Sequence, residues 1–216
     1  VARLSGVRGY DRRSFSHVLN MRAVARALAD KEGFVLEEVN VITVHLGGGI
    51  SLSVQSGGRF IDVFSADEGP YSTERSGGLP VYTAAAIARE EGAEGLYSYA
   101  VGRGGLFSYT GSTDALAIEQ KALSGDADMR LLYEGIAYQT AKAIGSLAAV
   151  VCGEVRAIVL TGGMARSKLI TDEIERRVRF IAPVHLYPGE LEMEALAAGA
   201  YRVMRGQEEA RILPED

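Results

Sequence analysis

The chain has 216 residues, of which 47% are hydrophobic and 24% charged, so it can bury a sizeable core. Its net charge of −5 argues against a sequence-independent nucleic-acid binder, which needs a basic face. The single cysteine, Cys152, excludes an intramolecular disulfide framework and fits a reducing compartment. The longest nearly unbroken apolar run, residues 143–152, is about half of what crosses a bilayer. These properties predict an acidic, cytoplasmic α/β protein.

The first third of the chain predicts one helix followed by three strands. An apolar stripe indicates a helix over residues 14–30, and a run of β-branched residues indicates a buried strand over 39–45. Two alternating segments, 50–55 and 59–64, flank Ser56-Gly57-Gly58, which is typical of a β-hairpin. Because the connections are tight, neighbouring strands of this group must pair antiparallel.

The rest of the chain predicts helices that alternate with two further strands. Helices are expected over 81–90, 114–123, 131–150, 167–179 and 192–205, and strands over 156–160 and 181–187. Cys152 follows an apolar helix and is interpreted as inert packing. Strands in a run, followed by alternating strands and helices, favour a mixed sheet with helices packed on it.

Two glycine clusters stand at the ends of predicted strands. Gly47, Gly48 and Gly49 follow the first strand, and without a Cβ their backbone N–H groups can approach an anion. No helix follows, so this is neither a Walker loop nor a dinucleotide fingerprint, and a bend in the sheet is an equal alternative. Gly162 and Gly163 lie between a strand and a helix, at a helix N-terminus that favours phosphate or a closely packed nucleoside. Together the two loops could hold a nucleotide, although each alone fits an ordinary tight turn.

Arg75 lies in an irregular polar segment, residues 68–80. An arginine in such a loop is usually a solvated surface charge, but Ser76, Gly77 and Gly78 beside it would let its planar fork reach a phosphoryl group. The three histidines, His17, His45 and His185, lack the spacing of a zinc site. Taken singly, each is more often a packed or surface residue than a catalyst.

Long motifs of the chain occur in the order found in the butyrate kinase family, which the chain resembles over essentially its whole length. These motifs span residues 13–17, 44–51, 69–80, 159–165, 181–183 and 187–200. Butyrate kinases belong to the acetate kinase branch of the ribonuclease-H-like, actin-like ATPases. The resemblance implies an α/β domain with a βββαβαβα mixed sheet and flanking helices, in agreement with the predicted element order. Gly48, where acetate kinases carry Asn, and residues 77–80 favour the butyrate kinase branch.

The resemblance also implies a role for each motif residue. At the phosphates, it implies that His17 lies beside the transferring phosphoryl group, that Arg75 binds the oxygens of this group, and that His45 with Gly47, Gly48 and Gly49 holds the β- and γ-phosphates. At the nucleoside, it implies that Gly162 and Gly163 pack on the nucleoside and that Asp114 lies near the adenosine. It also implies that Glu192, or alternatively Glu194, belongs to the magnesium shell.

The implied reaction is the ATP-dependent phosphorylation of butanoate to butanoyl phosphate, with ADP as the second product and Mg²⁺ as cofactor. Such a transfer is direct and in line, so the protein mainly positions groups and neutralises charge. A carboxylate is already ionised at neutral pH, and no general base is required. Isobutyrate and other branched acids remain alternative substrates. The implied partners are ATP, the acid and further copies of the chain in a dimer or larger oligomer, with no nucleic acid or membrane.

By the same resemblance, residues 1–190 form the second actin-like domain of the kinase. Residues 191–216 form a C-terminal helix that returns to a first domain, which would precede Val1. A cleft with one wall cannot desolvate or align its substrates, so the chain alone is expected to be inactive. A non-catalytic actin-like domain that binds nucleotide or a partner protein is an alternative of a different class. Another ATPase of this fold, such as a sugar kinase or chaperone, is not expected to carry residues 74–78.

Overall fold

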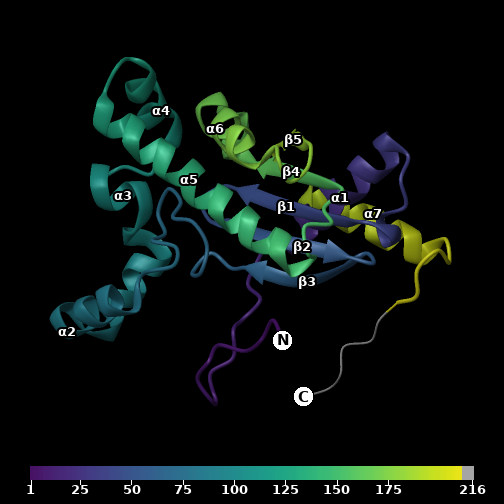
Figure 1. Cartoon of the computed structure of the whole chain (residues 1–216), viewed down its shortest axis with the longest axis horizontal. Coiled ribbons are helices and arrows are strands. Elements are labelled where there is room, and N and C mark those ends of the chain that lie inside the picture. Colours follow the sequence, from purple (N-terminus) through teal and green to yellow (C-terminus); the bar gives the residue numbers. More distant parts are fainter. Residues whose placement is uncertain (211–216) are drawn as a thin grey trace.

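The computed structural model of the chain describes residues 1–210, and five strands form one mixed sheet in the spatial order β3-β2-β1-β4-β5 (Figure 1). The central strand β1 pairs antiparallel with β2 and parallel with β4. On the outer sides, β3 pairs antiparallel with β2, and β5 pairs parallel with β4. The strands are β1 (Asn40–Leu46), β2 (Ile50–Ser56), β3 (Arg59–Phe64), β4 (Ala157–Gly162) and β5 (Val184–Pro188). This arrangement confirms the predicted mixed sheet.

The helices cover both faces of the sheet (Figure 1). On one face, α5 (Ala127–Val150) lies across the strands and packs against α4 (Ala115–Leu123) and α6 (Lys168–Val178). The main apolar core lies between α5 and the sheet and contains Ile42, Val44, Leu46, Ile144 and Leu160. On the other face, α1 (Val18–Glu32) packs on β1 and β4, and α7 (Glu192–Met204) packs on α1.

The alternation of β1 decides which of its side chains meet α1. Ile42, Val44 and Leu46 belong to the core beneath α5, so Thr43 and His45 point to the opposite face. In the sheet register, His45 is paired with Ser51 of β2 and with Thr161 of β4. Three polar side chains therefore form a row across the sheet at its α1 face.

The predicted hairpin between β2 and β3 is confirmed. Its turn residues Gly57 and Gly58 have φ angles of 57° and 70°. Two consecutive positive φ values fit a type I′ turn, whose twist matches that of the paired strands. Glycine adopts these angles without the steric cost that a side chain would add.

Residues 81–110 form a helical arm that projects from the sheet (Figure 1). The helix α2 (Val81–Ser98) extends beyond the predicted range of 81–90, because the chain kinks at Gly92, which has a φ of 78°, and then resumes helical geometry. A π-helical segment, η2 (Tyr99–Arg103), and the short helix α3 (Gly105–Thr110) follow, and neither was expected. No residue of α2 is buried.

Two expectations about local structure are wrong. Gly162 and Gly163 do not open an α-helix: Gly162 precedes a 3₁₀ turn, η3 (Gly163–Arg166), that begins at Gly163. The α-helix α6 starts after Ser167, whose hydroxyl caps it by accepting the Ile170 N–H. Cys152 is exposed rather than packed and has a φ of 55° in the turn that ends α5. A further 3₁₀ turn, η1 (Leu36–Glu38), leads into β1.

Within residues 1–210, every helix is too short or too polar to cross a lipid bilayer.

Gly162 and Gly163 provide a matched test of the contact between β4 and β1. Gly162 has a φ of 90°, and a Cβ there would overlap the backbone of Leu46, whereas a Cβ on Gly163 would meet nothing within 4 Å. We expect Gly162→Ala to lower the free energy of unfolding by about 2 kcal/mol or more and Gly163→Ala to change it by less than about 1 kcal/mol. Urea denaturation of both variants measures the difference. Equal stability of the two variants would contradict the close packing described here.

Candidate active site

Two stacked histidines lie at the centre of the candidate site. His17 occupies the position before the first residue of α1, and its ring lies 3.7 Å from that of His45, at an interplanar angle of 12°. Nδ1 of His17 is 2.9 Å from the hydroxyl of Ser51. The resemblance placed both histidines at the phosphates, and the structure brings them together through α1 and the end of β1.

Burial favours the neutral form of both imidazoles. Burial, as the larger cause, and the neighbouring His17 together lower the pKa of His45 to about 3. Burial also lowers the pKa of His17; Arg75 acts in the same direction, while the carboxylates of Glu192 and Glu190 oppose the shift. A pair of neutral rings can donate and accept hydrogen bonds without adding positive charge.

The loop formed by Gly47, Gly48 and Gly49 lies against this histidine pair. A Cβ on Gly47 would lie 2.7 Å from Nε2 of His45, and one on Gly49 would lie 3.2 Å from Nη1 of Arg75. Side chains at either position would therefore displace the two groups that flank the loop. Glycine leaves the backbone N–H groups of the loop accessible to a ligand next to His45 and Arg75.

Arg75 is held beside the glycine loop by its own segment. The Ser72 hydroxyl donates a hydrogen bond of 2.6 Å to the Gly48 carbonyl and accepts the Arg75 backbone N–H at 3.3 Å. The side-chain Nε of Arg75 is buried and has no hydrogen-bond partner within residues 1–210. A buried guanidinium donor without a partner is costly, and an anionic oxygen would satisfy it. The position of Arg75 thus fits an anion site over Gly47–Gly49.

The acidic residues of the site come from the segment that enters α7. Glu192 is the first residue of this helix and is near enough for its carboxylate to raise the pKa of His17. Glu194 instead lines the groove between α1 and α7, so of the two glutamates only Glu192 acts on His17. Glu190 lies beside the other histidine, with its Oε1 3.9 Å from Nε2 of His45.

These carboxylates fit a magnesium ion bound together with phosphates. No group of three or more His, Cys, Asp or Glu side chains within residues 1–210 forms a metal cage. Magnesium does not need one, because it usually keeps several waters and takes one or two carboxylates plus phosphate oxygens. Glu192, beside His17, can supply such a carboxylate.

The second glycine pair adjoins the same segment. The N–H of Gly162 donates to the Gly189 carbonyl at 2.9 Å, and the N–H of Gly189 donates back at 3.0 Å. These bonds join the end of β4 to the residue before Glu190. Gly162 and Gly163 thus lie next to the candidate site, at the turn between β4 and η3.

Asp114 lies apart from the histidines. Its carboxylate caps α4 by accepting the Ala117 N–H at 3.0 Å, and α4 packs on the part of α5 remote from α7 (Figure 1). Helix capping accounts for an aspartate at this position. No described contact joins Asp114 to His17, His45 or Arg75, and its role near adenosine stays a prediction.

Four further site residues were not identified from the sequence: Asn20, Ser51, Thr161 and Glu190. Asn20 lies in the first turn of α1, three residues after His17, and its neighbours Met21 and Val24 are buried. A polar residue on an otherwise apolar stripe is the signal that could have identified it. Ser51 and Thr161 become recognisable only when the strand register places them beside His45.

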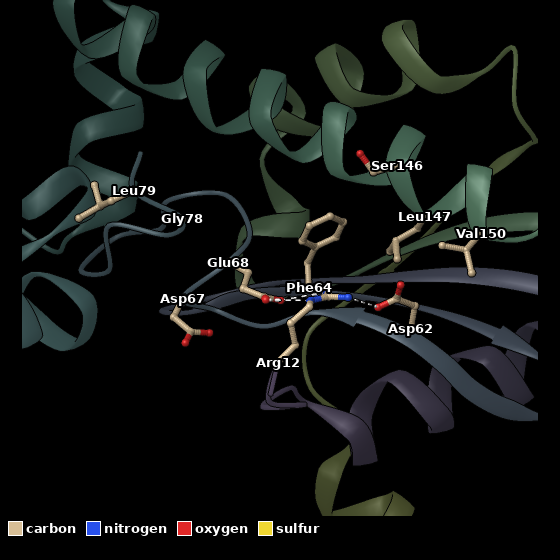
Figure 2. Close-up of a pocket in the computed structure, with 10 residues that line it drawn as sticks. All are labelled: Arg12, Asp62, Phe64, Asp67, Glu68, Gly78, Leu79, Ser146, Leu147 and Val150. Carbon is tan, nitrogen blue, oxygen red and sulfur yellow. Dashed lines mark hydrogen bonds and ion pairs between the residues drawn. The ribbon is translucent and has the colours of Figure 1, made fainter. Parts of the chain in front are cut away.

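A separate hollow of about 490 Å³ lies between α5 and β3 (Figure 2). Figure 2 shows Arg12 extended between Glu68 and Asp62 with Phe64 above it. The Arg12 guanidinium also donates to the carbonyls of Ala2 and Val63, both at 2.8 Å, so all its nitrogens are paired. Arg12 therefore anchors the N-terminal segment to the edge of the sheet rather than offering a free cation.

Comparisons with known proteins show which folds the chain resembles. The fold resembles an acetate kinase from Porphyromonas gingivalis (TM-score 0.81, 21% identity), over 90% of this chain and 56% of that one. It also resembles an acetate kinase from Entamoeba histolytica (TM-score 0.81, 20% identity), over 93% of this chain and 62% of that one. A propionate kinase from Francisella tularensis subsp. tularensis is similar too (TM-score 0.75, 20% identity), over 85% of this chain and 54% of that one. The chain thus spans little more than half the length of these kinases.

The sequence profile of the acetokinase family matches residues 1–189. The chain therefore belongs to the acetokinase family, and the ribonuclease-H-like, actin-like fold implied by the resemblance is confirmed.

The lowered pKa of His45 predicts a measurable pH dependence of stability. Between the ordinary pKa of 6.5 and about 3, the unfolded chain binds a proton at His45 that the folded chain excludes. The free energy of unfolding should therefore fall as the pH drops from 6 to 4, by about 1.4 kcal/mol per pH unit from this residue. Urea denaturation at several pH values would show a shallower slope for His45→Gln than for the wild type. Identical slopes would mean that His45 titrates alike in both states.

Proposed function

We propose that this chain supplies the second domain of an ATP-dependent kinase that transfers the γ-phosphoryl group to a short-chain carboxylate. The observation that carries the proposal is the side-chain Nε of Arg75, which is buried and has no hydrogen-bond partner within residues 1–210. Arg75 lies at one end of the loop Gly47–Gly49, and His45 lies at the other. Membership of the acetokinase family supports the same reaction class.

The site residues match what phosphoryl transfer to a carboxylate requires. Two anions must approach each other through a loose, in-line transition state, and the barrier is lowered mainly by positioning and charge neutralisation. In this proposal Arg75 binds the oxygens of the transferring group with its planar fork. The backbone N–H groups of Gly47–Gly49 and the ring of His45 hold the β- and γ-phosphates, and His17 lies beside the transferring group.

A magnesium ion on Glu192 would neutralise phosphate charge during the transfer. The neutral histidines are hydrogen-bonding groups rather than bases in this scheme. The reaction needs no general base, because the attacking carboxylate is already ionised at neutral pH. At the other end of the nucleotide, Gly162 and Gly163 would contact the nucleoside and Asp114 would lie near the adenosine.

We propose butanoate as the substrate, on the basis of Gly48 and residues 77–80, which resemble the butyrate kinase branch. Gly77 has a φ of 63°, and a Cβ there would lie 2.6 Å from the carbonyl carbon of Pro70, so this tight segment depends on glycine. One methylene changes discrimination by only about 1–3 kcal/mol, so acetate, propionate and isobutyrate are the competitors to compare. The similar structures are named as acetate and propionate kinases.

Residues 1–190 would be one of two domains, with the chain from residue 191 packing on the other. The helix α7, which lies in the segment from residue 191, supports packing against a second domain. The helix α7 buries none of its residues, and Met193 and Leu196 are 74% and 51% exposed. An apolar helix face of this kind indicates a surface that packs against further protein. Residues 211–216 lie outside the described part of the chain.

The intact mass of the protein produced by its own cell tests the two-domain proposal. We expect a mass well above 23.1 kDa, because a closed cleft needs a second wall. A native mass of 23.1 kDa would contradict this and favour a nucleotide- or partner-binding domain.

Arg75→Ala tests the reaction itself in that native protein. We expect the variant to lose at least about 100-fold in kcat for acyl-phosphate formation, since a charge-stabilising donor is removed from the transition state. ADP affinity should change much less. Hydroxylamine trapping with a panel of acetate, propionate, butanoate and isobutyrate measures turnover, and calorimetry measures ADP binding.

Arg89→Ala, on the exposed surface of α2, is the matched control and should leave both quantities unchanged. No acyl hydroxamate with any acid of the panel would refute the kinase proposal. A parallel loss of affinity and turnover in Arg75→Ala would make Arg75 a binding residue only.

A further inference from the structure

A closed hydrogen-bond network surrounds the side chain of Asn20, which is completely buried. Its Oδ1 accepts the backbone N–H of Leu191 at 2.9 Å. Its Nδ2 lies 3.0 Å from Nδ1 of His45 and 3.1 Å from the hydroxyl of Thr161. The Thr161 hydroxyl in turn donates to the Gly189 carbonyl at 3.0 Å. Every polar atom of the Asn20 side chain has a partner.

The backbone fixes the direction of each of these bonds. The Leu191 N–H can only donate, so the Asn20 atom that it meets must be the carbonyl oxygen. The other terminal atom of Asn20 is therefore the amide nitrogen, which can only donate. Nδ1 of His45 must then accept this bond and carries no hydrogen.

The network therefore determines where the proton of the His45 ring resides. A neutral imidazole has one N–H group, and with Nδ1 as acceptor that group is Nε2–H. Nε2 faces the glycine loop, where a Cβ on Gly47 would lie only 2.7 Å away. The Nε2–H of His45 therefore points to the space over the glycine loop, and Arg75 borders the same space at the Gly49 end.

We propose that Asn20 is a positioning residue that holds His45 as the Nε2–H tautomer, so that this ring donates a hydrogen bond to an anionic oxygen bound over Gly47–Gly49. The inference rests on the proposed function only in identifying that oxygen as one of a phosphoryl group. The opposite tautomer would direct a nitrogen lone pair at the anion and repel it. The partner that orients a functional imidazole commonly sets its tautomer in this way.

Asn20→Asp inverts the chemistry of the contact while keeping its shape. One carboxylate oxygen can still accept the Leu191 N–H, but the other can no longer donate to His45. We expect a hydrogen on Nδ1 of His45 in this variant, in place of the bare Nδ1 of the wild type. Nitrogen-15 NMR of the imidazole distinguishes protonated from bare ring nitrogens. Inorganic phosphate is the probe for the anion site, and its affinity should fall about tenfold or more.

Two control variants separate the tautomer from other effects. Leu19→Asp adds the same charge at the neighbouring, 43% exposed position and should weaken phosphate binding much less. Thr161→Val removes the two bonds that the Thr161 hydroxyl makes, to the Asn20 amide and to the Gly189 carbonyl, and leaves the Asn20–His45 contact, so the wild-type tautomer should persist.

A wild-type His45 with its hydrogen on Nδ1 would overturn the proposal, and this result needs no variant to fold. An unchanged ring pattern in Asn20→Asp, or phosphate affinities equal to those of Leu19→Asp, would also overturn it. The expected spectra and affinities combined with no acyl-phosphate formation would refute the kinase proposal and leave this inference standing.

Discussion

The buried amide of Asn20 is the interaction on which the candidate site depends. It joins α1, the end of β1, the end of β4 and the segment before α7 through His45, Thr161 and Leu191. Each of these segments contains or adjoins a group of the candidate site: His17, the glycine loop, Gly162 or Glu192. Their mutual positions are thus set by hydrogen bonds whose donors and acceptors have no alternative assignment.

The sheet makes this arrangement possible by separating its two faces. The apolar residues beneath α5 provide the main core, so the α1 face can carry polar side chains. Thr43 and Ser53 pair there at 2.7 Å, next to the row of Ser51, His45 and Thr161. A buried polar face is tolerated only when its groups are hydrogen-bonded. Both amide atoms of the fully buried Gln55, farther along β2, lack a partner and form an exception within the described residues.

The local elements could be predicted from the sequence, because their signals lie within a few residues. Period-two alternation and Gly57-Gly58 were sufficient for the hairpin, and apolar stripes were sufficient for α1 and α5. The arm of residues 81–110 could not be predicted in full, since Gly92 interrupts a helix that then continues. The 3₁₀ turn after Gly162 was missed because glycines between a strand and a helix do not specify where the helix begins.

The site could be predicted only in part. His17, His45, Arg75 and the first glycine loop were found through motifs, and the structure brings them together. The positions of Asn20 and Thr161 depend on strand register and helix packing, which join residues far apart in the sequence. The role of Asp114 near adenosine stays a prediction, and within the described residues its carboxylate caps α4.

The bond between Asn20 and Leu191 spans 171 residues, which has a consequence for how the protein acquires its site. Contacts of such sequence separation form late, because closing a long loop costs entropy before any contact repays it. During synthesis the strands β1, β2 and β3 can pair early, because they are close in the sequence. The hydrogen bonds that join His45, Asn20 and Leu191 can form only after residue 191 has left the ribosome. Nascent chains should therefore contain the paired strands β1, β2 and β3 before they contain the candidate anion site.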